Sequence, residues 1–86
     1  MSKNVPQQNL MELLEKFQFS AKEAEVYITL LEMGPAQAHD IAKRTSIHGT
    51  TLYVILEALL ANGFVSKYKN ASSRYYFNAL DPKKFV

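Results

Sequence analysis

The chain has 86 residues, no cysteine, a hydrophobic fraction of 48% and a formal net charge of +2. This length supports one small domain with a single core, and it argues against a deep catalytic cavity. The absence of thiols excludes disulfides, thiolate catalysis and thiolate zinc sites, and no apolar run approaches the roughly 18–20 residues of a membrane span. We therefore expect a cytoplasmic protein without a membrane segment.

The charge is unevenly distributed along the chain. Residues 1–42 carry three basic and six acidic side chains, whereas residues 43–86 carry seven basic and two acidic ones. An acidic first half and a basic second half indicate that one side of the domain meets a polyanion. The alternative is a solvated surface whose charge is merely uneven.

The first elements are a flexible arm and two helices. Residues 1–8 show no apolar periodicity, and a first helix is expected from Asn9 to Gln18. Ser20 with Glu23 three residues later forms a capping box that starts the next helix. We expect this helix to end at Gly34 in a left-handed cap followed by proline. Its predicted buried residues are Ala24, Tyr27, Ile28 and Leu31.

The middle of the chain has the pattern of two helices joined by a tight turn. A short helix is expected from Gln37, a weak N-cap, to Thr45, and a longer one from Thr50 to Asn62. Steeply crossing helices joined by so short a turn form a helix-turn-helix, with residues 48–53 free to face a partner. Spacings of three and four place on one buried stripe the residues Leu52, Ile55, Leu56 and Leu59.

After residue 63 the pattern changes to that of strands. Residues 64–69 and 74–78 are rich in aromatic and β-branched side chains, and the turn-forming residues 70–73 separate them. They predict a β-hairpin with Tyr75 and Phe77 on one face. The fold class is therefore mainly α with a small β-hairpin (α+β): a winged helix-turn-helix over residues 9–80, with about four helices plus a wing.

The last residues predict the start of a further helix at the C-terminus. Asp81 is a good N-cap and Pro82 is favoured at the first helical position. Residues 81–86 are too few to form a stable helix alone. Either a longer protein continues from the start of a linker helix, which we favour, or a natural terminus frays here.

Taken together, these residues resemble the winged helix-turn-helix domain of TrmB-like archaeal and bacterial transcriptional regulators. The similarity covers most of the chain, from Leu14 to Leu80. It is carried by Phe19-Ser20-x-x-Glu23-Ala24-x-x-Tyr27, Leu30-Leu31-Glu32-x-Gly34-Pro35-Ala36, Asp40-Ile41-Ala42, Leu52-Tyr53-x-Ile55-Leu56-x-x-Leu59, Gly63-Phe64-Val65 and Asp81-Pro82. The resemblance implies an N-terminal DNA-binding domain, promoter binding as a homodimer, and an effector such as a sugar that acts only through a C-terminal domain missing from this sequence.

The start of the second helix of the motif departs from the family. Family members commonly carry Arg or Lys there, whereas this chain has the neutral run from His48 to Thr51. This departure weakens base recognition through Arg–guanine contacts. The groups that remain are the Thr hydroxyls, the Thr methyl groups, which can contact thymine, and the backbone N–H groups at the helix start, which can bind phosphate. Val54 and Leu60 are apolar where the family is usually polar, so another protein surface is a second candidate to cover this helix.

We therefore expect a transcriptional regulator domain that binds double-stranded DNA. The residues predicted to contact bases from the recognition helix are His48, Gly49, Thr50, Thr51 and Val54. The residues predicted to contact phosphate, or to do so from the wing, are Lys43, Arg44, Lys67, Lys69, Asn70, Ser72, Ser73 and Arg74. The alternative is a protein-interaction or dimerisation module, using an apolar strip of Val54, Ala58, Leu60 and Ala61.

An enzyme is not expected, and neither is a metal or another cofactor. His39 and His48 are nine positions apart, which matches no metal-ligand spacing, and no glycine-rich phosphate loop is present. Tyr27 and Tyr53 are expected to pack at the edge of the core. Tyr68 and Tyr76 are expected on the more exposed face of the hairpin.

Overall fold

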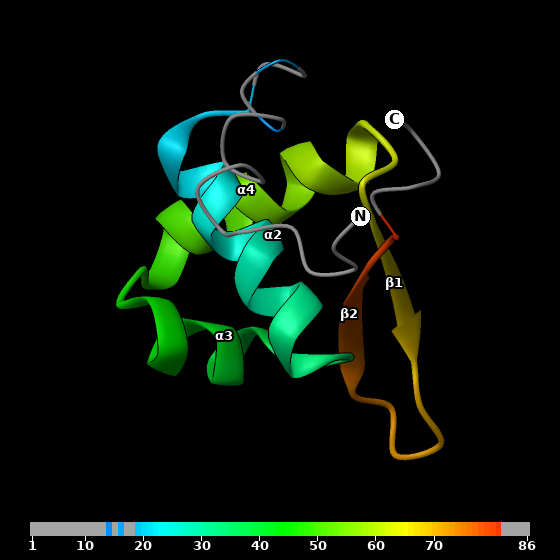
Figure 1. Ribbon diagram of the computed structural model, residues 1–86. Coiled ribbons are helices and arrows are strands. Elements are labelled where there is room, and N and C mark those ends of the chain that lie inside the picture. The colour runs from blue at the N-terminus through cyan, green and yellow to red at the C-terminus, as the bar shows by residue number, and fades with distance from the viewer. Residues whose placement is uncertain (1–13, 15, 17–18, 82–86) are drawn as a thin grey trace.

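The computed structural model describes Leu14, Lys16 and residues 19–81. They form helices α2 (Ala21–Met33), α3 (Ala38–Thr45) and α4 (Gly49–Ala61), followed by strands β1 (Val65–Lys69) and β2 (Tyr75–Ala79). Helix α2 lies centrally, with α4 across one end, α3 at the other and the hairpin alongside (Figure 1).

This architecture confirms a mainly α domain with a hairpin. The described residues contain three helices rather than the predicted four or so. The expected first helix lies outside them, except that Leu14 and Lys16 have helical backbone. The expected arm at residues 1–8 and residues 82–86 also lie outside the described part.

Helix α2 begins as its capping pattern predicts. The Ser20 hydroxyl accepts a hydrogen bond from the backbone N–H of Glu23 at 3.0 Å, and the Glu23 carboxylate accepts one from the N–H of Ser20 at 2.9 Å. At the other end Gly34 has φ 79° and ψ −166°. The predicted left-handed cap is therefore wrong, because this conformation belongs to a region that essentially only glycine occupies and it sends the chain into an extended segment.

The buried face of α2 is wider than predicted. Val26 and Leu30 are fully buried, whereas Leu31, which we expected in the core, is only partly buried. The reason is that α3, α4 and β2 all pack against α2, so it is covered on more than one side.

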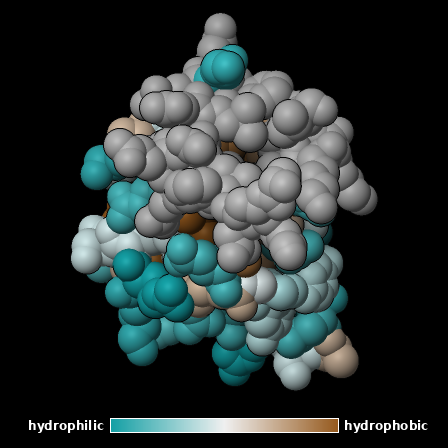
Figure 2. Space-filling view, in the orientation of Figure 1, coloured by the Kyte–Doolittle hydropathy of each residue, from teal (hydrophilic) through white to brown (hydrophobic). Residues whose placement is uncertain are grey.

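On the side of the molecule seen in Figure 2, hydrophilic residues cover most of the described surface.

Tyr27 lies in the core, which confirms its predicted burial on α2 and places it deeper than the core edge. Its ring is 0% exposed and packs edge-on against Phe19, with the ring centroids 5.5 Å apart. Its hydroxyl donates a hydrogen bond to the backbone carbonyl of Leu80. Burial, assisted by the negative charge of Asp81, raises the pKa of Tyr27 well above its ordinary value. This contact joins the central helix to the segment that follows β2.

The hairpin is anchored to the helices by a third extended segment. Strands β1 and β2 are antiparallel, with Lys67 opposite Phe77 and Lys69 opposite Tyr75. The N–H of Ala36 donates to the carbonyl of Phe77 at 3.0 Å, and the N–H of Phe77 donates to the carbonyl of Ala36 at 2.8 Å. The link between α2 and α3 therefore forms a short bridge beside β2.

Candidate nucleic-acid interface

The turn between α3 and α4 is built around the hydroxyl of Thr45. This buried side chain donates to the carbonyl of Ile41 at 2.8 Å and accepts from the N–H of Ile47 at 3.2 Å. Ser46 takes the left-handed conformation, with φ 61°, and Ile47 is inserted into the core. These contacts reverse the chain within a few residues and fix where α4 starts.

Helix α4 begins at Gly49, one residue earlier than expected. His48 is its N-cap but makes no side-chain capping hydrogen bond, and Gly49 has φ 60°. The first N–H groups of α4 therefore have no side-chain cap, and the N-terminus of a helix favours anions. The predicted stripe is confirmed, since the helix buries Leu52, Ile55, Leu56 and Leu59.

The start of α4 faces outward. All five residues predicted to contact bases are exposed: His48, Gly49, Thr50, Thr51 and Val54. Tyr53, which we expected at the edge of the core, is also exposed, by 54%. Its neighbour Leu52 belongs to the buried stripe, so at 100° per residue Tyr53 turns away from the core. This spacing was visible in the sequence and identifies Tyr53 as part of the exposed face.

An open groove separates α4 from the start of α2. Its volume is about 570 Å³ and its lining is mainly apolar. The α4 side contributes Thr50, Thr51, Val54 and Ile55, and the α2 side contributes Ser20, Ala21, Lys22 and Glu23. Lys22 is exposed beside residues predicted to contact bases, although it is 28 positions from Thr50 in the sequence. Only the packing of α2 on α4 brings these two segments together.

A second hollow, of about 260 Å³, lies between α4 and the wing. Its lining comprises Gln37, Ala38, His39, Tyr53, Lys67, Tyr75 and Phe77. The ammonium of Lys67 lies 4.6 Å from the ring centroid of Tyr75, and that of Lys69 lies 5.4 Å from the same ring. Contacts of this kind hold both cations on the face of the hairpin that turns toward α4. Tyr75 and His39 thus join a surface for which the sequence pointed only to the lysines.

The tip of the wing is closed by Asn70. Its side-chain oxygen accepts from the N–H of Ser72 at 2.9 Å and from the N–H of Arg74 at 3.0 Å. Ser73 has φ 64°, and Ser72, Ser73 and Arg74 are exposed. On the other face of the hairpin the rings of Tyr68 and Tyr76 stack, with centroids 5.8 Å apart. The predicted turn is present, and Asn70 has a structural role in it.

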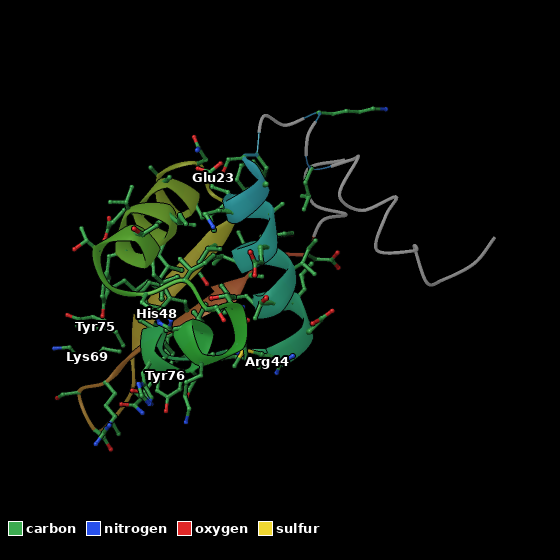
Figure 3. The ribbon with its side chains drawn as sticks, turned by 90° about the vertical axis from the view of Figure 1, so that its left-hand side faces the viewer. Glu23, Arg44, His48, Lys69, Tyr75 and Tyr76 are labelled. Carbon is green, nitrogen blue, oxygen red and sulfur yellow. The ribbon has the colours of Figure 1, made fainter. Side chains whose placement is uncertain are left out.

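The two predicted phosphate contacts on α3 differ in their surroundings. Lys43 is exposed, and Arg44 forms an ion pair of 3.6 Å with Glu32 of α2. Figure 3 shows Lys69 and Tyr75 on one side of His48 and Arg44 on the other. Arg44 therefore lies apart from the wing, and both members of its ion pair are about half exposed, with side-chain values of 54% and 53%.

The apolar strip proposed for a protein partner is interrupted. Val54 is 62% exposed and Ala61 is exposed, but Leu60 packs partly against the core. Among the described residues no group of three or more His, Cys, Asp or Glu side chains is placed to hold a metal ion. The same part of the chain has no helix long and apolar enough to cross a membrane.

Comparison with known proteins places this arrangement among transcription regulators. The family model described as "Sugar-specific transcriptional regulator TrmB" matches residues 14–83. A similar protein is the "HTH-type sugar sensing transcriptional regulator TrmBL1" of Pyrococcus furiosus, which is 36% identical over 59 residues, or 69% of this chain and 17% of that protein. The uncharacterized protein YrhO of Bacillus subtilis is 28% identical over 58 residues, covering 67% of this chain and 21% of its own length. The chain thus spans about a fifth of the length of the curated relatives it matches.

Two solved structures share the fold at low sequence identity. The crystal structure of YusO from Bacillus subtilis has a TM-score of 0.73 and 18% identity, covering 91% of this chain and 57% of that one. TrmBL2, described as "an archaeal chromatin protein" with "a novel mode of DNA binding", has a TM-score of 0.72 and 20% identity. That match covers 92% of this chain and 30% of the TrmBL2 chain.

Proposed function

Because the chain belongs to the TrmB family of sugar-specific transcriptional regulators, we propose that its winged helix-turn-helix domain binds duplex DNA. The observation that carries the proposal is the outward start of α4, where His48, Thr50 and Thr51 are all exposed. A helix presented in this way fits the major groove, which is wide enough to admit it.

Within this proposal, the two sides of α4 contact the DNA backbone. The wing supplies Lys67, Lys69 and Arg74, and the loop residues Asn70, Ser72 and Ser73 lie beside them. Lys43 and Arg44 contact phosphate from the end of α3, and Arg44 exchanges its half-exposed partner Glu32 for phosphate. An exposed ion pair is worth at most about 1 kcal/mol, so this exchange costs little.

Homodimerisation and a sugar response are also proposals. A two-fold dimer places two α4 helices in successive major grooves, roughly 34 Å apart on a near-palindromic site. TrmBL1 is named a sugar-sensing regulator, and the matched segment is 17% of it. We therefore propose that any response to sugar depends on a part of the protein other than residues 14–83.

The salt dependence of DNA affinity tests the proposal. With about five phosphate contacts per subunit, the logarithm of the association constant should fall with the logarithm of salt concentration at a slope of roughly −4 to −5 per monomer. The variant K67A/K69A/R74A loses three contacts, so its slope should be shallower by roughly 2 to 3. Fluorescence anisotropy with a labelled duplex, at four or more salt concentrations, measures both slopes.

Lys16→Ala is the matched control, because it removes a cation that is exposed but belongs to neither the wing nor the turn. Its slope should equal that of the unaltered chain. A flat salt response of the unaltered chain would rule out the proposed mode of binding. A second outcome concerns the function of the protein. If K67A/K69A/R74A kept the full function of the unaltered chain while Val54→Glu abolished that function, a protein partner and not DNA would be the main ligand.

A further inference from the structure

The exposed face of α4 carries no positive charge. Residues 45–66 contain no Lys or Arg, and the acidic residue of α4 is Glu57. The commonest specific contact with guanine is a bidentate one from Arg or Lys to O6 and N7. This helix therefore lacks the side chains that make that contact, and base recognition from it must use other groups.

Methyl groups are what this face offers instead. Val54 is 62% exposed and is the aliphatic member of the large exposed hydrophobic residues of the described chain, the others being Tyr53, Tyr68 and Tyr75. Thr50 and Thr51 lie four and three positions before Val54, so one turn of helix brings their side chains next to it. All three line the mainly apolar groove beside the start of α2. We call Thr50, Thr51 and Val54 the methyl patch.

Cations lie on both sides of the methyl patch but not within it. Lys22 lines the same groove from α2, and Lys67 lines the hollow on the wing side of α4 together with Tyr53. This distribution fits a DNA duplex with α4 in its major groove. The base edges would then lie against the methyl patch, and the two phosphate backbones would lie near the cations on either side. In the major groove, the apolar group on a base edge is the C5-methyl of thymine, and Thr and small apolar side chains pack against it.

We propose that the methyl patch recognises the C5-methyl groups of thymine, so that the base pairs beneath Val54 in the preferred site are A·T. This inference rests on the proposed DNA binding and specifies which bases α4 contacts. Thymine also presents its O4 acceptor in the same groove, within the chemistry of the threonine hydroxyls, which donate as well as accept. The aromatic residue on this face, Tyr53, lies on the side of α4 that faces the wing. We expect it near the phosphates that the wing contacts.

Deoxyuridine substitution tests the proposal, because it removes the methyl group of thymine and leaves every hydrogen-bonding group in place. A preferred duplex is first selected from a random pool with the unaltered chain. Each thymine is then replaced singly by deoxyuridine, and the affinity is measured by anisotropy. At one or two positions per half-site the affinity should fall about fourfold, the effect expected for one buried methyl group. Replacement at the remaining thymines is the internal control and should change affinity less than twofold.

The variant Val54→Ala assigns the effect to the patch. Val54 is mostly exposed, so the truncation spares the core, and thermal unfolding verifies that the variant is folded. Its deoxyuridine penalty should vanish at the position beneath Val54, whereas Val54→Thr, which keeps one methyl group, should retain part of it.

Two results would overturn the inference. If the unaltered chain binds its selected duplex with the expected salt dependence but is indifferent to every deoxyuridine replacement, the methyl contact is wrong and the proposed DNA binding stands. If no salt-dependent binding is found, and Val54→Glu instead disrupts self-association in sedimentation, the patch is a protein surface and the proposed DNA binding fails with it.

Discussion

Thr45 is the residue on which the geometry of the helix-turn-helix depends most directly. It is the buried polar side chain of the described core, and its hydroxyl both donates and accepts within the turn. Thr45→Val keeps the shape of the side chain and removes both hydrogen bonds, which leaves the N–H of Ile47 buried without this acceptor. We expect the free energy of unfolding to fall by about 1–3 kcal/mol.

Urea denaturation followed by circular dichroism measures this loss. Thr45→Ser is the matched variant, because it keeps the hydroxyl and loses only a methyl group, and it should be the more stable of the two. Equal destabilisation by Val and Ser would show that packing and not hydrogen bonding holds the turn.

Tyr27 gives the domain a specific sensitivity to alkaline pH. Its folded-state pKa is raised above the value of about 10 for an unfolded chain, so the unfolded state releases the proton more readily. The stability that Tyr27 contributes is complete below pH of about 10 and declines as the pH rises further, by up to about 1.4 kcal/mol per pH unit.

Tyr27→Phe removes this titration along with the hydrogen bond to Leu80. The variant should be less stable than the unaltered chain at pH 7 by about 1 kcal/mol, and the difference should shrink or reverse by pH 11. Denaturation curves at both pH values measure it. Tyr68→Phe alters an exposed tyrosine and should be neutral at pH 7. A constant Tyr27→Phe deficit at all pH values would contradict the assignment.

Individual residues were predictable from sequence where one helical stripe determined them. The four buried positions of α4 followed from spacing alone, because that helix is covered on one side. The same reasoning correctly predicted three buried residues of α2, Ala24, Tyr27 and Ile28. It was wrong for Leu31 and missed Leu30, because three elements cover this helix. It also misplaced Tyr53, which lies just outside the stripe that the spacing had already identified.

At the scale of the element, Asn70 closes the wing tip and is also one of the residues proposed to lie against phosphate. Asn70→Ala removes the acceptor of two backbone N–H groups, so we expect a loss of about 1 kcal/mol in the free energy of unfolding. Asn70→Asp keeps an acceptor in the same place and adds a negative charge. It should retain most of the stability and bind DNA several-fold more weakly, because its charge faces phosphate.

Thermal unfolding and anisotropy, performed on both variants, separate the two roles. If Asn70→Asp bound DNA as tightly as the unaltered chain at low salt, the wing tip would lie away from the duplex. Ser72→Ala provides the control for the stability measurement alone, because it removes an exposed hydroxyl and keeps the hydrogen bond from the backbone N–H of Ser72 to Asn70.

Elements with local signals were predictable, and those that depend on distant partners were not. The capping box and the hairpin turn are each encoded within four or five residues, and the structure contains both. The bridge between Ala36 and Phe77 joins residues 41 positions apart, and nothing in the short segment around Pro35 distinguishes it from a loop. Helix α4 shows the boundary error typical of such reasoning, because it begins at Gly49 and not at the predicted Thr50.

At the scale of the whole molecule, the candidate interface is a composite of three helices and the wing. The groove joins α4 to the start of α2, and the hollow joins α4 to the start of α3 and to the wing. The sequence indicated the centre of this surface, at residues 48–54, and its basic wing. The contributions of Lys22 and His39 could not be predicted, since they depend on how the helices cross.

The bridge between Ala36 and Phe77 has a consequence for how the domain meets its ligand. Its two hydrogen bonds hold strand β2 of the wing against the segment that leads into α3, and α3 in turn packs against α4. The spacing between the wing and α4 is thus set before DNA binds. Little conformational freedom of the protein remains to be lost on docking. A duplex whose groove width differs from this spacing must therefore deform, and DNA sequences that resist deformation should bind with lower affinity.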